Sequence, residues 1–365
     1  MTGKLVLENL KHKPMRSLLS FLLIGVPVTL ILTLVGLTNG MSEDAQRRAR
    51  GSGADVIVRG TNASSALNFS GATLLDKFVG FLQQQPHVKV AVGVINHPIE
   101  LPLVVTGVDL SQFNAMSGGF LYREGGPFQG PHDMIVDQYY ASQRHAHAGD
   151  DITVMNRQWH VSGVIEGGKL SHIMVPLNTL QDLDSATGKL SQIYLKLDDP
   201  ANTAAVIEDL KKKMPGYPIW SMEELTSMLS VNNFQGVKEL MSVIMGIGVV
   251  IGFAVVCLSM YMSVLQRTRE IGILKSLGGS KAFILRIILA EALILGLGGT
   301  VLGVVMSFGA YWLIRTFIPA SIPMVIVFAW WPIAGAITLV GAGLGAVYPG
   351  LSAASHDPIE ALAYE

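Results

Sequence analysis

The chain has 365 residues, of which 50% are apolar and 15% charged, and its net charge at pH 7 is −1. Its mean hydropathy is +0.44. Soluble domains carry about a quarter charged residues, so this composition argues against an ordinary soluble enzyme. No basic stripe interleaved with aromatic residues occurs, which argues against nucleic acid as a partner.

The charges are concentrated in one part of the chain. Residues 41–238 hold 16 lysines and arginines and 20 aspartates and glutamates, whereas the other 167 positions hold 10 and 7. This distribution is typical of a membrane protein with one large water-soluble insertion. The single cysteine, Cys257, lies in an apolar run, so no disulfide can form within the insertion.

The first apolar run is Ser17 to Leu37, 21 residues without a charge. As a helix it would span about 31 Å, close to the roughly 30 Å hydrocarbon core of a bilayer. A signal peptide is the alternative, but its apolar region would be about 7–15 residues long and would end in a small-residue cleavage site. We therefore predict a retained membrane span, in which Pro27 is placed to introduce a kink.

The insertion alternates strand-like and helical patterns, which predicts an α+β domain in two lobes. A polar segment over 42–50 is predicted to form a helical stalk. Leu74, Leu75, Phe78 and Leu82 share a helical face, which predicts a helix over 70–85. The other predicted elements are strands over 54–59, 88–95, 103–108, 151–155, 158–165 and 193–197, a turn at Asn156-Arg157, and a helix over 201–213.

The insertion carries no recognisable enzyme motif. His145 and His147 with Asp150 and Asp151 could hold a metal ion, but the spacing fixes no closed set of ligands, so a solvated loop is favoured. Two glycosylation sequons begin at Asn62 and Asn68, and both are attributed to chance. Neither a Gly-x-Ser-x-Gly elbow nor a His-Glu-x-x-His motif occurs.

Three later runs are also long enough to cross a membrane. Glu291 is the one charge inside them; it lies about one turn into its span, so an interfacial carboxylate near Arg286 is favoured over a proton relay. A secondary transporter or ion pore therefore has no obvious machinery. The runs are Leu240 to Leu265, Ile287 to Ile314, and Trp330 to Tyr348.

A short amphipathic segment separates the second and third spans. Ile271, Leu274 and Leu277 are at helical spacing, and Gly278-Gly279 ends the pattern. Such a helix suits either a lipid surface or a groove in another protein. The run from Gly278 to Lys281 superficially resembles a phosphate loop but lacks the Walker A frame, so we expect no ATP site there.

Basic residues indicate the orientation. They cluster before the first span and between the second and third, and the positive-inside rule places both clusters in the cytoplasm. The predicted segments are a cytoplasmic amphipathic N-terminal segment (1–16), membrane spans (17–40, 239–265, 287–315 and 330–350), an extracytoplasmic α+β domain (41–238), a cytoplasmic coupling loop (266–286), an outer loop (316–329) and a cytoplasmic tail (351–365).

Several stretches carry a resemblance to a known family. The most specific is the cytoplasmic loop Gln-Arg-Thr-Arg-Glu-Ile-Gly-Ile-Leu-Lys-Ser-Leu-Gly-Gly-Ser over 266–280, which resembles the hallmark of FtsX/MacB-type ABC transporter permeases. The termini, over 8–19 and 348–362, are also similar to this family. Weaker similarities to its periplasmic core lie at 149–154, 161–164 and 175–177.

The resemblance implies a membrane α-helical fold of four spans with an inserted domain like the MacB periplasmic core. It implies a permease subunit that works as a dimer with separate ABC ATPase subunits, which would bind the ATP and Mg²⁺. No catalytic, metal or cofactor residue is expected in this chain, whose layout resembles that of the DevC-like and lipoprotein-releasing permeases. The residues expected to couple to the ATPase are Arg267, Thr268, Arg269, Glu270, Gly272, Leu274, Lys275, Leu277, Gly278 and Lys281.

Three functions stay open. The first is efflux or extrusion of an amphiphilic cargo (lipid, lipoprotein, peptide, antibiotic or haem) by a permease of a bacterial inner membrane, for which a periplasmic adaptor and an outer-membrane channel are candidate partners. The second is a cell-envelope regulator that activates a hydrolase. The third is a membrane-anchored sensor without an ATPase, against which only the resemblance argues.

Pairs of glycines four residues apart let helix backbones approach closely in lipid. Gly248 and Gly252 form such a pair in the second span, and similar pairs occur at 299/303 and 341/345. These glycines pack helices either within one subunit or between two. Because the resemblance places the first two spans at the dimer centre, we predict that Gly248 and Gly252 contribute to a homodimer interface.

Overall fold

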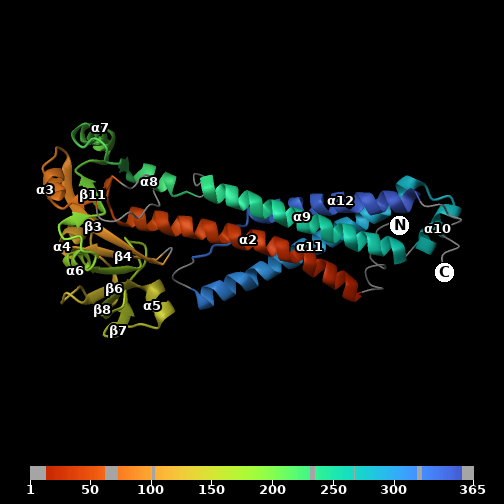
Figure 1. Ribbon diagram of the computed structural model, residues 1–365, viewed down its shortest axis with the longest axis horizontal. Coiled ribbons are helices and arrows are strands. Elements are labelled where there is room, and N and C mark those ends of the chain that lie inside the picture. The colour runs from red at the N-terminus through yellow and green to blue at the C-terminus, as the bar shows by residue number, and fades with distance from the viewer. Residues whose placement is uncertain are drawn as a thin grey trace. The chain divides into compact units, whose positions relative to one another are not determined.

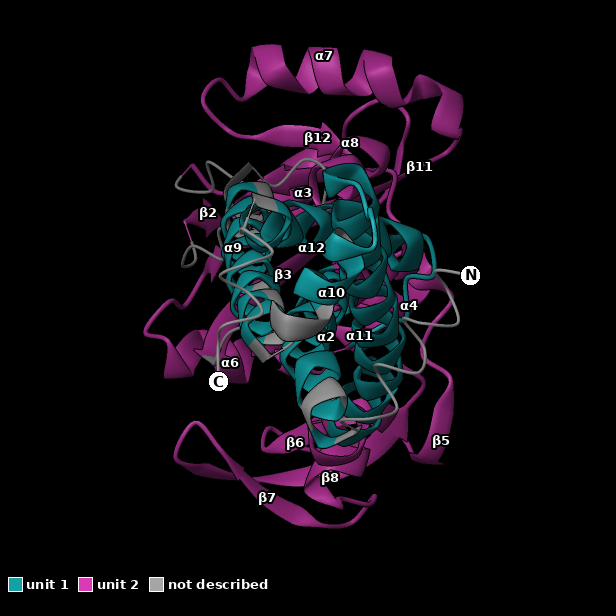
Figure 2. Cartoon of the chain, turned by 90° about the vertical axis from the view of Figure 1, so that its right-hand side faces the viewer, with its two compact units in different colours: residues 1–38, 236–313, 324–365 teal, residues 39–235, 314–323 magenta. Residues whose placement is uncertain are grey.

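The computed structural model of the chain describes residues 14–61, 73–100, 103–230, 235–266, 268–318 and 323–355. The chain divides into two compact units (Figure 2). We call residues 39–235 with 314–323 the sheet domain, and residues 1–38, 236–313 and 324–365 the helical unit. The basic residues before Pro14, the two sequons and the C-terminal motif over 357–362 lie outside the described residues.

Four helices within the described residues are long and apolar enough to cross a membrane. The first continues without a break from the predicted span through the predicted stalk, and the third begins six residues before the predicted span. These helices and the short one between the second and third are α2 (Pro14–Gly51), α9 (Gln235–Gln266), α10 (Thr268–Ser276), α11 (Lys281–Phe317) and α12 (Trp330–Ser355) (Figure 1).

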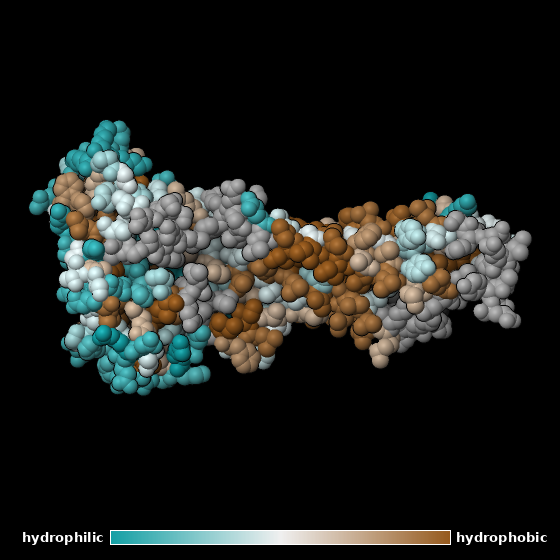
Figure 3. Space-filling view, in the orientation of Figure 1, coloured by the Kyte–Doolittle hydropathy of each residue, from teal (hydrophilic) through white to brown (hydrophobic). Residues whose placement is uncertain are grey.

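Small and hydroxyl residues hold the helical unit together. A Cβ added to Gly303 of α11 would lie 2.6 Å from Val28 Cβ of α2, so only a glycine permits this approach. Thr29 Oγ1 donates to the carbonyl oxygens of Gly25, at 2.9 Å, and Gly303, at 3.0 Å. The surface of the long helices carries hydrophobic residues, whereas that of the sheet domain is mainly hydrophilic (Figure 3).

The sheet domain is built on a ten-stranded mixed sheet in the order β12-β1-β11-β3-β4-β9-β6-β8-β5, with β7 paired to β8. The pairs β4–β9 and β6–β8 are parallel and the others antiparallel. The strands are β1 (Val56–Arg59), β3 (Val88–Glu100), β4 (Leu103–Val108), β5 (Tyr122–Gly125), β6 (Asp133–Asp137), β7 (Asp151–Val154), β8 (Arg157–Ile165), β9 (Ile173–Pro176), β11 (Gln192–Leu197) and β12 (Ile219–Ser221); β2 (Leu74–Leu75) and β10 (Lys189–Leu190) pair separately.

Helices cover both faces of this sheet. On one face α4, α8 and the end of α2 enclose a single apolar cluster. On the other, α5 and α6 cover one cluster and α3 and α7 a second. The helices are α3 (Lys77–Gln83), α4 (Leu110–Ser117), α5 (Gln138–Arg144), α6 (Leu177–Leu183), α7 (Thr203–Lys213) and α8 (Met222–Met228), with a 3-10 turn η1 (Pro200–Asn202).

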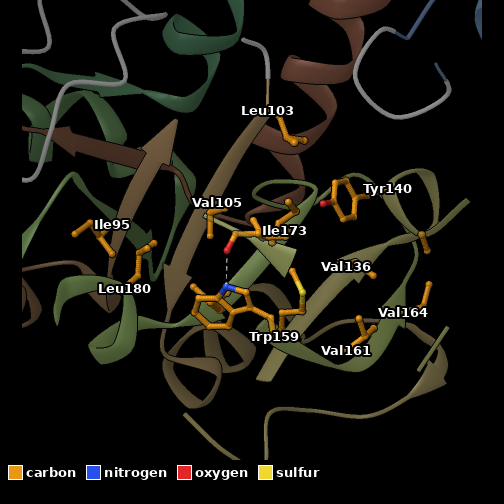
Figure 4. Close-up of a cluster of buried hydrophobic side chains, with 14 of the residues drawn as sticks. Ile95, Leu103, Val105, Val136, Tyr140, Trp159, Val161, Val164, Ile173 and Leu180 are labelled. Carbon is orange, nitrogen blue, oxygen red and sulfur yellow. Dashed lines mark hydrogen bonds between the residues drawn. The ribbon is translucent and has the colours of Figure 1, made fainter. Parts of the chain in front are cut away.

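The domain is thus built on one continuous sheet where two lobes were predicted. Figure 4 shows the cluster around Trp159, whose side chain is 2% exposed. The indole Nε1 donates to the carbonyl oxygen of Val154 at 3.1 Å. A large aromatic side chain is thus buried with its one polar group satisfied.

Two local predictions are wrong. The helix predicted over 70–85 begins at Lys77, because Leu74–Leu75 pairs with Lys189–Leu190 as a strand and Leu74 is completely buried there. The turn between β7 and β8 is at Met155-Asn156, one residue earlier than predicted. Both residues have positive φ, 55° and 57°, as a two-residue hairpin of the primed type requires.

Candidate functional site

The predicted coupling loop contains one short helix, α10, and a defined C-terminal cap. Gly278 adopts φ +91°, which a glycine tolerates, and the amide of Gly279 donates to the carbonyl oxygen of Leu274 at 2.9 Å. This bond closes a Schellman motif, so the double glycine ends the helix as predicted. Ser280 then caps the start of α11, its hydroxyl accepting from the amide of Phe283 at 3.2 Å.

The two sides of α10 differ. Gly272 is buried and Ile271 packs against the buried cluster of the helical unit, whereas Ile273 is 44% and Leu277 80% exposed. Leu274 is half-buried and Gly278 exposed. Arg267 lies outside the described residues; of the other predicted coupling residues, Thr268, Arg269, Glu270 and Lys275 belong to α10 by their backbone.

A groove lies between the start of α11 and the end of α12 in the helical unit. Its volume is about 570 Å³, and it is lined by Lys281, Leu285, Tyr348, Leu351 and neighbouring small residues. Tyr348 is 69% and Leu351 54% exposed. The predicted coupling residue Lys281 therefore borders an apolar groove, and together with Ile273 and Leu277 this groove forms the candidate docking surface.

Gly248, one of the two predicted packing glycines, contacts a helix of its own chain. A Cβ on Gly248 would lie 3.3 Å from Ile31 Cδ1 of α2, and one on Gly345 would lie 2.7 Å from the carbonyl oxygen of Phe253 in α9. Gly252 follows Gly248 by one turn of α9. Gly248 thus has a packing role within the subunit, and the predicted homodimer interface stays a prediction.

Glu291 is 8% exposed and lies among the buried residues of α11, whereas Arg286 is exposed. The carboxylate therefore lies in the interior of the helical unit, and its predicted position near the membrane interface stays a prediction.

A buried ionic cluster that the sequence did not reveal fixes the end of α2 within the sheet domain. Arg48 forms an ion pair with Asp44 one turn earlier and donates to Nε2 of His172. Because an arginine only donates, His172 must donate from Nδ1, which lies 2.6 Å from Asp137 Oδ2. Asp137 Oδ1 meanwhile caps α5 by accepting from Tyr139 and Tyr140 amides.

A second bond holds the same segment: Ser42 Oγ donates to the carbonyl oxygen of Leu229 at 2.6 Å. Leu229 directly follows α8, the last helix of the sheet domain before the chain enters α9. The sheet domain is thus bonded to the end of α2 near the points where the chain enters and leaves it.

The histidines and aspartates of the predicted solvated loop do not converge. His147 Nδ1 lies 3.2 Å from Glu124, Asp150 accepts from the His147 amide, and Asp151 contacts His160 at 3.1 Å. His145 caps α5. Among the described residues no three histidine, cysteine, aspartate or glutamate side chains form a group able to hold a metal ion.

Comparison with known proteins gives two family matches. Residues 17–213 match the MacB-like periplasmic core domain, and residues 242–358 match the FtsX-like permease C-terminal family. The ABC transporter permease YknZ of Bacillus subtilis is 25% identical, covering 98% of this chain and 96% of YknZ.

The macrolide export ATP-binding/permease protein MacB of Burkholderia cenocepacia is 27% identical, and the match covers 96% of this chain and 55% of MacB. The chain thus spans little more than half the length of such ATP-binding/permease relatives. A crystal structure of the periplasmic region of MacB from Actinobacillus actinomycetemcomitans matches 49% of this chain and 94% of that region at 14% identity, with a TM-score of 0.38. The core-domain match alone covers more than half of the sequence, and the chain therefore belongs to the MacB/FtsX-type ABC transporter permeases.

Proposed function

We propose that this permease transmits the work of a separate ATPase subunit to the sheet domain, and that it exports or extrudes an amphiphilic cargo. In this proposal the protein spans a bacterial inner membrane, with the sheet domain outside and both termini in the cytoplasm. The ATPase subunit binds ATP and Mg²⁺, and this chain supplies no catalytic residue. The positive-inside distribution of lysine and arginine supports this orientation.

The observation that carries the proposal is the exposure of Ile273 on α10 and of Leu277 directly after it. Complete burial of a leucine side chain contributes about 1.5–3 kcal/mol, so a leucine left 80% exposed beside charged residues suits a surface that a partner covers. The groove at Lys281 and Leu285 offers that partner a second contact.

Two features of α2 support transmission of motion. It is a single helix of 38 residues, about 57 Å long at the usual helical rise. Its last two turns are fixed in the sheet domain by Arg48, His172 and Asp137. A displacement of its membrane segment would therefore reach the sheet domain through a stiff element.

The composition of the spans favours a mechanism in which work is done outside the membrane, and it argues against a cargo path between the helices. The buried side of the helical unit is mainly alanine, glycine and aliphatic residues, which suits close helix packing more than a polar conduit. Two copies would match two ATPase subunits. The naming of relatives as macrolide exporters favours an amphiphilic cargo, for which an adaptor and an outer-membrane channel are candidate further partners.

Photo-crosslinking tests the docking surface. A benzoylphenylalanine in place of Leu277 should crosslink, in membranes of the native host, to a protein that carries a Walker A motif. The same probe in place of Leu344, which is 59% exposed on α12, is the matched control and should not. Leu277→Asp should also remove vanadate-sensitive ATP hydrolysis from the purified complex. Equal crosslinking from both positions, or unchanged hydrolysis, would contradict the proposal.

A transport measurement distinguishes an exporter from an envelope regulator. Intact cells preloaded with a fluorescent amphiphile should extrude it in an ATP-dependent manner, and Leu277→Asp should abolish the extrusion. Hydrolysis that depends on Leu277 without movement of any amphiphile would favour the hydrolase-activating alternative.

A further inference from the structure

A cavity of about 120 Å³ lies inside the sheet domain, between the end of α2, α8 and the sheet. Its lining comes from α2, from α8 and the residue after it, from the loop before β9, and from four strands that are consecutive in the sheet, β1, β11, β3 and β4. Liquid water occupies roughly 30 Å³ per molecule, so this space holds about four waters or one small organic molecule.

A row of polar side chains crosses the strands on the cavity side. Gln192 of β11 is the register partner of Arg59, and Asn96 of β3 is that of Thr106. All four line the cavity and are less than 10% exposed. Elsewhere this sheet face carries the apolar cluster under α4 and α8, so the polar row is a local departure from a hydrophobic surface. Polar side chains placed in a core at a cost in stability are typical of a binding site.

Two of these side chains have unused hydrogen-bonding groups. Asn96 Oδ1 accepts from Thr106 at 2.9 Å, and Gln192 Nε2 donates to the Tyr194 hydroxyl at 2.6 Å. Among the described residues nothing bonds to the other two side-chain atoms, the donor Asn96 Nδ2 and the acceptor Gln192 Oε1. Because Gln192 is the register partner of Val94, it lies diagonal to Asn96, and the Cβ atoms of such neighbours are about 7 Å apart. One ligand group that both accepts and donates can therefore bridge them.

The charged groups around the cavity are already engaged. Arg48 pairs with Asp44, and His172 lies 2.6 Å from Asp137. Arg59 has interactions of its own as well. An ion would find no uncompensated charge here, whereas a neutral ligand leaves these pairs intact.

The wall on the side of the helices is apolar. Ala45 and Ala49 of α2, Leu225 of α8 and Leu229 directly after it line the cavity there. A group of water molecules would find no hydrogen-bond partner along this wall, whereas a short hydrocarbon chain would contact it. The cavity thus combines a neutral polar edge with an apolar wall.

We propose that the cavity binds a small neutral amide of about three to five carbons. Its carbonyl oxygen accepts from Asn96 Nδ2, its N–H donates to Gln192 Oε1, and its hydrocarbon part contacts Ala49 and Leu225. This binding does not depend on the proposed transport function. The sequence pattern does not reveal the site, because Asn96 and Gln192 lie on strands that are far apart in the chain.

Calorimetric titration of the full chain in detergent with isobutyramide tests the site. We expect saturable binding, at least about 10-fold weaker for 3-methyl-2-butanone, which has the same shape but no N–H for Gln192 Oε1. Gln192→Leu should weaken isobutyramide binding by a similar factor, and Ala49→Leu, which fills the space, should abolish it. Gln158→Leu is the matched control, since Gln158 is an exposed glutamine on β8 of the same sheet, and it should bind as the wild type does.

Several results would overturn the proposal. Absence of saturable isobutyramide binding would mean that the cavity holds water only. Equal binding of the ketone would contradict recognition of the amide, and tighter binding of isobutyrate would indicate a site for a charged ligand. If Gln192→Leu does not fold, Ala49→Leu carries the test, because it leaves the polar row unchanged. Unchanged binding by a folded Ala49→Leu protein would place the ligand elsewhere.

Discussion

The sheet domain and the helical unit differ in which residue types are buried and which are exposed. Among the described residues of 73–230, the large hydrophobic side chains that are exposed are Leu75, Phe81 and Leu121. On the long helices there are many more, and Leu297, Val301 and Val305 are three of them, at 57–59% exposed. The interior of the sheet domain holds a tryptophan and an ionic cluster, and that of the helical unit holds glycines. The contrast teaches that water and lipid leave different residues available for holding a fold together.

The largest expected effect is on the core of the sheet domain. Trp159→Ala removes a side chain that is 2% exposed and should lower the free energy of unfolding by about 3–5 kcal/mol. Trp312→Ala on α11, where the side chain is 62% exposed, is the matched control and should change it by less than about 1 kcal/mol. Thermal unfolding in detergent, followed by circular dichroism, measures both. Equal destabilisation would erase the contrast between the units.

The buried ionic cluster should come next. Arg48→Ala leaves Asp44 buried without its cation and should cost about 3 kcal/mol. Arg123→Ala removes an arginine that is 53% exposed and 3.3 Å from Glu166, so it should cost less than about 1 kcal/mol. Chemical denaturation of the two variants compares them. A silent Arg48→Ala would mean that the cluster does not stabilise the end of α2.

Glycine packing in the helical unit is expected to matter somewhat less. Gly303→Ala places a Cβ 2.6 Å from Val28 Cβ and should lower stability by about 1–3 kcal/mol, because α2 and α11 must separate. Gly309→Ala, whose Cβ would meet nothing within 4 Å, should leave the Tm unchanged or raise it. The Tm of each variant is measured in the same detergent. A larger decrease for Gly309→Ala than for Gly303→Ala would show that the helices do not meet at Gly303.

The smallest effect is a pH dependence in the sheet domain. Burial, opposed by the charge of Arg59, raises the pKa of Tyr194 to about 12 from its ordinary 10.0. The unfolded chain then loses this proton first, so stability is complete below pH 10 and falls as the pH rises from 10 to 12, by about 1.4 kcal/mol at pH 11. Tyr194→Phe should lack this part of the fall. Parallel curves for the two proteins between pH 9 and 11 would contradict the assignment.

The sequence predicts the helical unit better than the sheet domain. An uncharged run of about 20 residues has few alternatives to a membrane helix, and the double glycine at 278–279 defines the end of α10. Strands β6 and β9 escaped prediction because they are short and buried on both faces, so neither shows an alternation of polar and apolar residues. Leu74 and Leu75 fit the helical pattern predicted over 70–85, but they form a strand that pairs with Lys189–Leu190. A periodic pattern therefore does not exclude pairing with a distant strand.

The candidate docking surface was predictable in part. The helical spacing of Leu274 and Leu277 is local, whereas the groove beside Lys281 needs residues of α12 that lie almost 70 positions later. The ionic cluster at the end of α2 was not predictable, because Arg48 and His172 are 124 residues apart and each alone reads as an ordinary surface residue. Only the fold brings them together.

Site-directed labelling tests most directly the central claim that the sheet domain and α10 lie on opposite sides of the membrane. Cys257→Ser provides a background without cysteine, into which Gln129→Cys or Ser276→Cys is introduced, both at exposed positions. A membrane-impermeant maleimide added to intact cells should modify the protein that carries Gln129→Cys and spare the one that carries Ser276→Cys until the membrane is opened. Labelling of Ser276→Cys in intact cells, with Gln129→Cys protected, would contradict the account.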